Sequence, residues 1–421
     1  MKPSNISWVG EIPCSWDVFR GKDVLTSKRL INSAKQESNI LSLTLRGVRR
    51  NDPESPIGLV PSDYASYQIF EENDLVFKLI DLENIRTSRI GLVKERGIMS
   101  PAYVRLTPKN PSSAKFLAWY FIDLWNRDVF QSMGGCGVRS SLSSSELMQQ
   151  PLPQPPLIEQ IAIAAYLDKA TATIDKQRDL LERKKALLQE HKKAVIHEAV
   201  TKGLKPGVQM KPSGVDWIEC IPCHWQIARC ESAFSERIGR GSSSGRVLTV
   251  SIANGIMPQH DYEALTGRKL STPTTEKDNY KFVAVGDLVY NKMRMWQGAV
   301  AASDFEGVVS PAYVVLKPLK NIHHKFAEYQ LRSALFVEQS NLYSYGIVDD
   351  QNSLRYCDFK AMTIALPPLA EQLAIATFLD QSCQLLDRQC ELIDRKIELL
   401  GKLRESTIHE AVTKGVPASA V

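Results

Sequence analysis

The sequence predicts a mixed α/β (α+β) protein in which two globular domains, related by an internal repeat, are separated by two long helices that form an antiparallel coiled coil. Three observations lead to this prediction: a duplication that runs the length of the chain, two proline-free stretches of constant sequence, and apolar residues repeated every seven positions within them. The two divergent parts between the stretches contain short β-rich runs separated by turn residues, which is typical of globular α/β domains.

The duplication is visible in matching segments. "PPLIEQIAIAAYLD" begins at Pro155 and "PPLAEQLAIATFLD" at Pro367, 212 positions later, and "HEAVTKG" recurs at the same spacing at His197 and His409. The opening "MKPSNISWVGEIPCSW" matches a segment that begins at Met210. Because the order of the matching segments never changes, the chain is one unit of about 210 residues written twice, with a variable part and a nearly constant part in each copy.

This organisation predicts five segments. The first variable domain spans residues 1–153, the first long helix 154–204, the second variable domain 205–365, the second long helix 366–416, and a tail 417–421. Strands are expected in the variable domains at "ILSLTL", "DLVFKLI", "RIGLVKE" and "AYVRL", and again at "RVLTVSI", "DLVYNKM" and "AYVVLKP". A helix is expected after the strands of each domain, near "AKFLAWYFIDLWNRDVFQ" and "HKFAEYQLRSALFVEQ".

The constant parts are expected to be helices that pair with each other. Pro155 and Pro156 suit a helix start, Gly203 suits a helix end, and no proline or glycine lies between them up to Thr201. A helix of about 45 residues spans roughly 65–70 Å and needs a partner to cover its apolar stripe. The predicted helix-pairing seam consists of Leu167, Ile174, Leu181, Leu188, Val195, Leu379, Leu386, Ile393 and Leu400. Antiparallel pairing would relate the two copies by a pseudo-twofold axis, an arrangement that suits two DNA half-sites at a fixed separation.

Composition narrows the class of protein. The 421 residues are 43% hydrophobic and 24% charged, which is ordinary for a soluble protein, and no apolar run approaches the ~20 residues that a membrane helix requires. The N-terminus lacks the pattern of a signal peptide, and eight cysteines in so long a chain do not require a disulfide framework. We therefore expect a cytoplasmic protein. The net charge of +5 permits nucleic-acid binding only through a local basic surface.

Sequence motifs of catalysis are lacking. No G-x-x-x-x-G-K-[ST] phosphate loop occurs, and "SPAY" at Ser100 and Ser310 lacks the Asn-Pro-Pro-aromatic pattern of adenine amino-methyltransferases. A zinc site at Cys220, Cys223 and His224 is not expected, because no second CxxC follows at finger spacing. We expect no catalytic residue, no metal ion and no cofactor in this chain.

The doubled motifs resemble those of the specificity subunit of Type I restriction–modification systems. The resemblance rests on "QPPLIEQIAIAAYLD" and "LPPLAEQLAIATFLD", on the "HEAVTKG" that ends each helix, and on "WVGEIPCSW" and "WIECIPCHW" at the start of each variable domain. It covers essentially the whole chain. It implies that each variable domain is a target recognition domain that reads one half of a bipartite double-stranded DNA site, and that the helices set the spacer and dock two methyltransferase subunits.

The same resemblance implies where the chemistry resides. S-adenosylmethionine would bind the partner methyltransferase subunits, which modify adenine, and ATP and Mg²⁺ would bind a restriction subunit if one is present. The specificity subunit itself would be non-catalytic.

Residues that could contact DNA are cationic or polar side chains in loops and at strand ends. The candidates in the first domain are Arg46, Arg49, Arg50, Lys78, Arg139 and Ser140, and those in the second are Arg240, Arg246, Lys292, Arg294, Tyr345, Gln351 and Arg355. Any one of these side chains could equally be a solvated surface residue, so the clusters weigh more than the individuals.

Two alternatives remain open at this stage. A single-chain restriction or methylation enzyme would need cofactor or nuclease motifs, which the sequence lacks. A coiled-coil scaffold without DNA readout would not require two divergent β-rich domains. Salt-dependent duplex binding separates the DNA-reading hypothesis from the scaffold.

Overall fold

The computed structural model describes residues 1–45, 47–52, 63–80, 82, 90–133, 141–215, 217–239, 245–270, 279–345 and 352–417. It divides into two compact units. The first unit comprises Met1–Glu182 with Asp394–Val421, and the second comprises Arg183–Ile393. Each unit therefore combines one variable domain with parts of both long helices, and each is described by itself.

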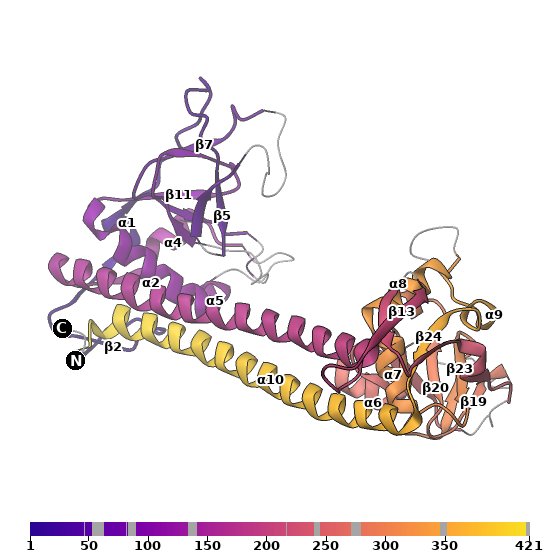
Figure 1. The fold of residues 1–421 in the computed structure, drawn as a ribbon. Helices are drawn as coiled ribbons and strands as arrows, with labels where there is room; N and C mark the ends of the chain where they lie inside the picture. The colour runs from indigo at the N-terminus through magenta and orange to yellow at the C-terminus, as the bar shows by residue number, and fades with distance from the viewer. Residues whose placement is uncertain are drawn as a thin grey trace. The chain divides into compact units, whose positions relative to one another are not determined.

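The first unit is built around a four-stranded antiparallel sheet with the strand order β4-β11-β8-β9. Helix α2 packs on this sheet beside β9 (Figure 1). The helices of its variable domain are α1 (Gly21–Val24), α2 (Ala114–Asn126), α3 (Val129–Met133) and α4 (Ser144–Gln149). The strands are β1 (Lys2–Pro3), β2 (Glu11–Ile12), β3 (Asp17–Arg20), β4 (Leu25–Thr26), β5 (Leu41–Thr44), β6 (Gly47–Arg50), β7 (Gln68–Phe70), β8 (Leu75–Phe77), β9 (Ile90–Leu92), β10 (Gly97–Met99), β11 (Val104–Pro108) and β12 (Pro151–Gln154).

The second unit repeats this plan, with an antiparallel sheet in the order β16-β23-β20-β21. Its shorter helices are α6 (Gln259–Thr266), α7 (His324–Arg332), α8 (Ala334–Leu342) and α9 (Tyr356–Phe359). The strands are β13 (Met210–Val215), β14 (Ile218–Pro222), β15 (Gln226–Arg229), β16 (Phe234–Glu236), β17 (Leu248–Ser251), β18 (Gly255–Pro258), β19 (Lys281–Val283), β20 (Leu288–Asn291), β21 (Val300–Ala302), β22 (Gly307–Val309), β23 (Tyr313–Pro318) and β24 (Thr363–Leu366). Every sheet strand matches its counterpart in the first unit, so the predicted mixed fold with an internal repeat is confirmed.

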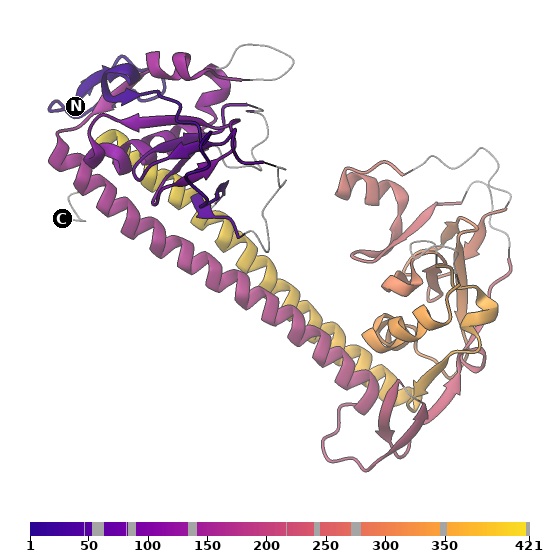
Figure 2. The ribbon, with the colours of Figure 1, turned by 90° about the horizontal axis from the view of Figure 1, so that it is seen from above.

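Two helices of 46 residues each follow the variable domains: α5 (Leu157–Lys202) and α10 (Leu369–Lys414). They lie side by side in both views (Figures 1 and 2). Gly203, with φ +76°, ends the first, and Gly415, with φ +92°, ends the second, because glycine adopts this left-handed conformation without a steric penalty. The described residues contain no helix that is both long enough and apolar enough to cross a membrane.

The helices run antiparallel in each unit. In the first, Glu159 lies near Gly415 and Asp175 pairs with Arg404, and in the second, Gly203 lies near Glu371 and Lys192 pairs with Asp387. In the first unit, Arg404 Nε of α10 lies 3.2 Å from Asp175 Oδ1 of α5. In the second, Lys192 Nζ of α5 lies 2.7 Å from Asp387 Oδ1 of α10. Arg404 lies 212 positions after Lys192, and Asp387 lies 212 positions after Asp175. The two pairs are thus the same contact made twice, and charge pairs of this kind help to set the register of paired helices.

Apolar packing attaches each variable domain to the helices. In the first unit, Trp16 and Phe116 form an edge-to-face pair 6.4 Å apart within a cluster that includes Leu167 of α5 and Ile408 of α10. In the second, the corresponding cluster joins Trp225, Phe326 and Leu379 with residues near the end of α5. The two tryptophans of the "IPCSW" and "IPCHW" motifs are therefore core residues at the domain–helix junctions.

Candidate nucleic-acid interface

Two of the predicted cations of the first domain lie on one β-hairpin. Arg49 and Arg50 are exposed on β6, which pairs antiparallel with β5. The hairpin packs against β9, where Gly91 leaves so little room that an added Cβ would come within 2.6 Å of Val48 Cγ2. The packing fixes the hairpin that carries both arginines. As consecutive strand residues they point to opposite faces, and both are exposed, so either guanidinium is available for phosphate contact.

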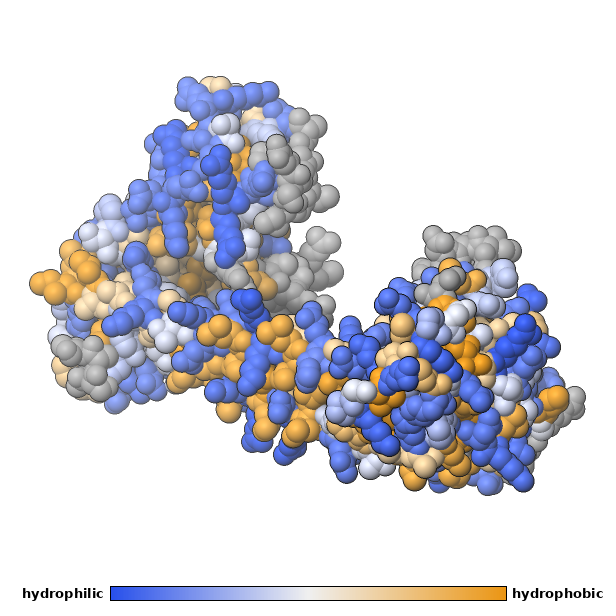
Figure 3. Space-filling model, viewed as in Figure 1, coloured by the Kyte–Doolittle hydropathy of each residue, from blue (hydrophilic) through white to orange (hydrophobic). Residues whose placement is uncertain are grey.

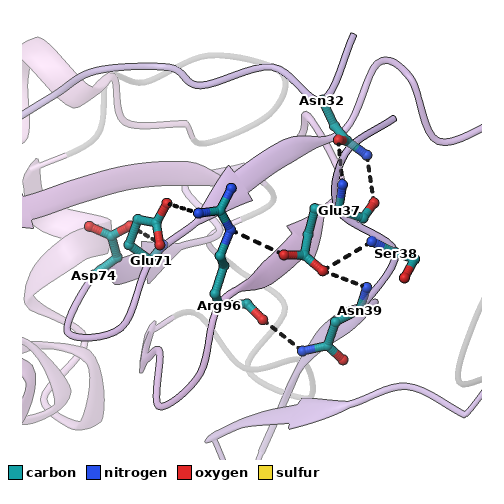
Figure 4. A network of polar contacts seen from close by, with 7 residues as sticks. All are labelled: Asn32, Glu37, Ser38, Asn39, Glu71, Asp74 and Arg96. Atoms are coloured by element: carbon teal, nitrogen blue, oxygen red, sulfur yellow. Dashed lines mark hydrogen bonds and ion pairs between the residues drawn. The ribbon is translucent and has the colours of Figure 1, made fainter. Parts of the chain in front are cut away.

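A polar network supports the start of this hairpin (Figure 4). Arg96 contacts Glu37 and Glu71, with Nε 3.1 Å from Glu37 Oε2 and Nη1 3.2 Å from Glu71 Oε1. Asn39 Nδ2 donates to the backbone carbonyl of Arg96 at 2.7 Å. The backbone carbonyl of Asn39 accepts from Ile98 N–H, also at 2.7 Å. Because Asn39 lies two residues before β5, these bonds hold the strand that carries the hairpin.

A lysine follows the equivalent central strand in both domains. Lys78 comes directly after β8, and Lys292 comes directly after β20. Both are half-buried, and Lys78 has a polar partner. Burial, reinforced by the neighbouring Lys281 ammonium, lowers the pKa of Lys292 below that of an exposed lysine. Lys292 is therefore held in a partly desolvated position where an anion would interact more strongly than at an open surface.

The second domain brings four of the predicted residues to one place. The Leu354 N–H donates to the Lys292 carbonyl at 3.0 Å, which places Arg355 beside the segment that carries Lys292 and Arg294. Tyr345 is bridged to Ser353, one residue before Leu354, by backbone hydrogen bonds of 3.0 and 3.3 Å. The Arg294, Tyr345 and Arg355 side chains are exposed. Residues 345 and 353–355 thus lie beside the distant segment 292–294, and together they form one basic and aromatic surface.

Arg246 occupies a different position in the second domain. It is exposed two residues before β17, where its carbonyl accepts from Val308 N–H of β22 at 2.8 Å. Gly307 lies against this carbonyl, and an added Cβ there would come within 2.5 Å of the carbonyl oxygen. Gly97 occupies the equivalent position in the first domain, where an added Cβ would come within 2.6 Å of the Asn39 carbonyl oxygen.

We expect Gly307→Ala to destabilise the second domain by about 1–3 kcal/mol, because backbone must shift to admit the methyl group. The matched control is Gly239→Ala, since an added Cβ there meets no atom within 4 Å. Thermal unfolding of both variants checks the difference. Equal unfolding temperatures would show that β17 and β22 separate without cost and would contradict the close approach.

The remaining predicted DNA contacts, Arg46, Arg139, Ser140, Arg240 and Gln351, lie outside the described residues. The part of the chain that the structure describes contains no cluster of three or more His, Cys, Asp or Glu side chains that could hold a metal ion. Cys223 is exposed, and the His224 ring instead contacts Glu371, with Nε2 2.8 Å from Oε2.

The predicted seam residues differ in burial between the two helices. On α10, Leu379, Leu386, Ile393 and Leu400 are all at most 9% exposed. On α5, Leu167 and Ile174 are buried, whereas Leu181, Leu188 and Val195 are half-buried. The residues four positions after the seam residues also differ between the helices, and this accounts for the difference in burial. They are Arg178, Lys185 and Lys192 on α5, whereas they are Cys383, Cys390 and Ile397 on α10.

The constant motifs meet at the ends of the helices. Glu371, from "PPLAEQ", lies against the end of α5, since a Cβ added at Gly203 would come within 2.7 Å of its Oε1. Glu159, from "PPLIEQ", lies against Gly415 at the end of α10 in the same way, at 2.9 Å. A larger residue at either glycine would displace the glutamate side chain and would also be strained at the positive φ, so both features favour glycine there.

Helix α10 carries a second apolar stripe, which was not predicted from the sequence. Phe378, Leu385 and Leu392 repeat every seven residues and are 41%, 61% and 55% exposed, and Leu187 of α5 in the same unit is 57% exposed. Figure 3 shows hydrophobic side chains gathered over the two long helices. The sequence contains this pattern as a second series of apolar residues that repeats every seven positions beside the predicted seam. Such a stripe indicates a surface that contacts another protein.

Comparison with known proteins identifies the family. The family model of the Type I restriction modification DNA specificity domain matches residues 13–185 and 253–400, which is most of the chain. The chain belongs to this family. The putative type I restriction enzyme MjaX specificity subunit of Methanocaldococcus jannaschii is 23% identical over 384 residues, which cover 87% of each chain. The resemblance to Type I specificity subunits is thereby confirmed.

Solved structures of this family share the fold. A chain from a structural study of complex assembly and conformational transition of the type I R-M system has a TM-score of 0.68 at 15% identity, covering 96% of this chain and 98% of that one. The HsdS subunit of Thermoanaerobacter tengcongensis has a TM-score of 0.53 at 16% identity, with coverage of 96% and 97%.

Proposed function

We propose that this chain is the DNA-reading subunit of a Type I restriction–modification complex, in which each variable domain reads one half of a bipartite site. The observation that carries the proposal is the duplication itself: two domains with the same sheet topology but different exposed cations, each attached to the same pair of antiparallel helices. Different side chains on a common frame would read different bases at a separation that the helices determine.

The two domains differ in the exposed side chains of the proposed contacts. The first presents Arg49 and Arg50 from a hairpin, whereas the second presents Arg294, Tyr345 and Arg355 from segments around β20. Arginine can recognise guanine through two hydrogen bonds, and phosphate contacts fix register without reading sequence. The long helices would dock the two methyltransferase subunits, and the exposed apolar stripe of α10 would form part of that contact in the second unit.

The proposal assigns chemistry to the partners. S-adenosylmethionine would bind the methyltransferase subunits, and ATP and Mg²⁺ would bind a restriction subunit where one accompanies the complex. The specificity chain would contribute binding and positioning without a catalytic residue of its own.

The test is modification-sensitive sequencing of the host genome with and without this gene. Loss of N6-methyladenine at one split motif upon deletion would support the proposal and reveal the recognised sequence. An unchanged methylome, in a host that expresses the chain with its methyltransferase, would contradict it.

Charged substitutions in the stripe should weaken docking. We expect Leu385→Glu combined with Leu392→Glu to weaken methyltransferase binding by at least about tenfold, because a carboxylate buried in an apolar contact is strongly unfavourable. Co-purification and size-exclusion chromatography of the mixed subunits measure the effect. The stability of the isolated chain should not change, since both side chains are exposed.

The control for this experiment is Leu265→Glu, which places the same charge on a leucine that is 66% exposed on α6, away from the long helices. Retained binding in the Leu385→Glu, Leu392→Glu variant would remove α10 as the docking surface.

A further inference from the structure

Each variable domain is tied to a long helix by the same directional contact, made with different chemistry. In the first unit, the Trp119 Nε1–H of α2 donates to Asp168 Oδ1 of α5 at 3.0 Å. In the second, the Tyr329 hydroxyl of α7 donates to Asp380 Oδ1 of α10 at 2.7 Å. Asp168 and Asp380 are 212 positions apart, and Trp119 and Tyr329 are 210 apart. The repeat thus keeps an aromatic donor and an aspartate acceptor at one point of each junction.

Other charges reinforce the first contact, and apolar packing surrounds the second. Lys115 Nζ lies 2.8 Å from Asp168 Oδ2, and the Arg404 guanidinium of α10 lies 5.9 Å from the centre of the Trp119 ring, within cation–π range. Because Arg404 also pairs with Asp175, the domain, α5 and α10 are linked through one tryptophan. In the second unit, Tyr329 packs in the apolar cluster that joins the domain to both helices.

The apolar clusters and these hydrogen bonds constrain the domain differently. Burial of Phe116 or Phe326 holds a domain against its helix but is non-directional, so it tolerates small rotations. A hydrogen bond to a carboxylate is directional and weakens steeply away from linear geometry. One such bond between a domain helix and a long helix therefore restricts the rotation that packing alone would allow.

We propose that the Trp119–Asp168 and Tyr329–Asp380 contacts are positioning elements that fix the orientation of each recognition domain on the helices and thereby the spacer length that the chain accepts. This inference rests on the proposed function. Trp119 and Tyr329 act through the domains and are not themselves base-reading residues. Loosening either contact lets the domain rotate, so half-sites at neighbouring separations become acceptable while the bases read stay the same.

The experiment expresses the full chain with its methyltransferase partner and maps N6-methyladenine across the genome. We expect Tyr329→Phe and Asp380→Leu to raise methylation at motifs with a spacer one base pair longer or shorter by about tenfold, the factor that corresponds to loss of one hydrogen bond to a charged group. Asp380→Asn should keep the parental spacer, because its amide oxygen can still accept from the Tyr329 hydroxyl. Both half-motifs should be unchanged in all variants.

Tyr262→Phe is the matched control, since it removes a hydroxyl from a half-buried ring on α6 of the same domain. Unchanged spacer discrimination in Tyr329→Phe and Asp380→Leu would overturn the inference. So would loss of all methylation together with a lowered unfolding temperature, because that pattern assigns the contact to folding. A parental chain that directs no split motif would instead contradict the proposed function, so the two failures are distinguishable.

Discussion

Replacing residues 1–150 with the corresponding domain of another specificity subunit is expected to change one half of the methylated motif and leave the other half unaltered. The second unit contains its own sheet and its own apolar cores, made entirely of residues between Arg183 and Ile393. Its fold therefore does not depend on which first domain is attached. Sequencing of N6-methyladenine in cells that carry the parental or the chimaeric gene measures the result.

The design of the chimaera follows from the junction. Trp16, Phe116 and Trp119 contact the long helices, so the replacement domain should retain aromatic residues at these three positions. A second chimaera that lacks them is the control, and it should lose methylation at the motif altogether. If the first chimaera altered both half-motifs together, the two domains would not read DNA independently.

Much of the fold could be predicted from the sequence because the chain contains its own comparison. The helix ends followed from Pro155, Pro156 and Gly203, and the observed α5 spans Leu157–Lys202. The runs "DLVFKLI" and "DLVYNKM" contain β8 and β20, the equivalent central strands of the two sheets. These features depend on local propensity and periodicity, which a single sequence displays directly.

The contacts between distant segments could not be predicted in the same way. In the sequence, Trp119 and Tyr329 contribute only to a helical pattern, because that pattern does not distinguish tryptophan or tyrosine from other apolar residues. Their common property, an N–H or O–H aimed at an aspartate of a long helix, becomes visible only when α2 and α7 are packed. Similarly, the proximity of Tyr345 and Arg355 to Lys292 depends on backbone bonds around Ser353 and Leu354.

Both domains have a buried aspartate before the central strand, and in each the aspartate pairs with an arginine that comes from a different segment. Asp74 is fully buried and accepts from Arg105 Nε at 2.5 Å, where Arg105 belongs to β11. Asp287 occupies the same place before β20, but its partner is Arg237, with Nε 2.6 Å and Nη2 2.8 Å away. Arg237 follows β16 rather than lying on the strand that corresponds to β11, where valine stands at 315. The same carboxylate is thus neutralised from two different strands.

The arginine should be required in each domain as long as the aspartate remains. We expect Arg237→Met to cost the second domain about 3–5 kcal/mol of unfolding free energy, because it leaves a buried carboxylate without its counter-charge. Urea unfolding of the full chain measures the loss, and Arg105→Met should have the same effect on the first domain. In each variant, methylation should be lost because only the domain that carries the substitution no longer reads its half-site.

The double variant Arg237→Met, Asp287→Asn separates charge neutralisation from the packing of the arginine. Asparagine can still accept the Ala284 N–H, which donates to Asp287 Oδ2 at 2.8 Å, and it carries no charge that requires a partner. We therefore expect the double variant to recover most of the stability that Arg237→Met loses. A double variant as unstable as the single one would show that the arginine stabilises the domain through its aliphatic contacts with the sheet, and Arg105 and Arg237 would then not share the role of counter-charge to the buried aspartate.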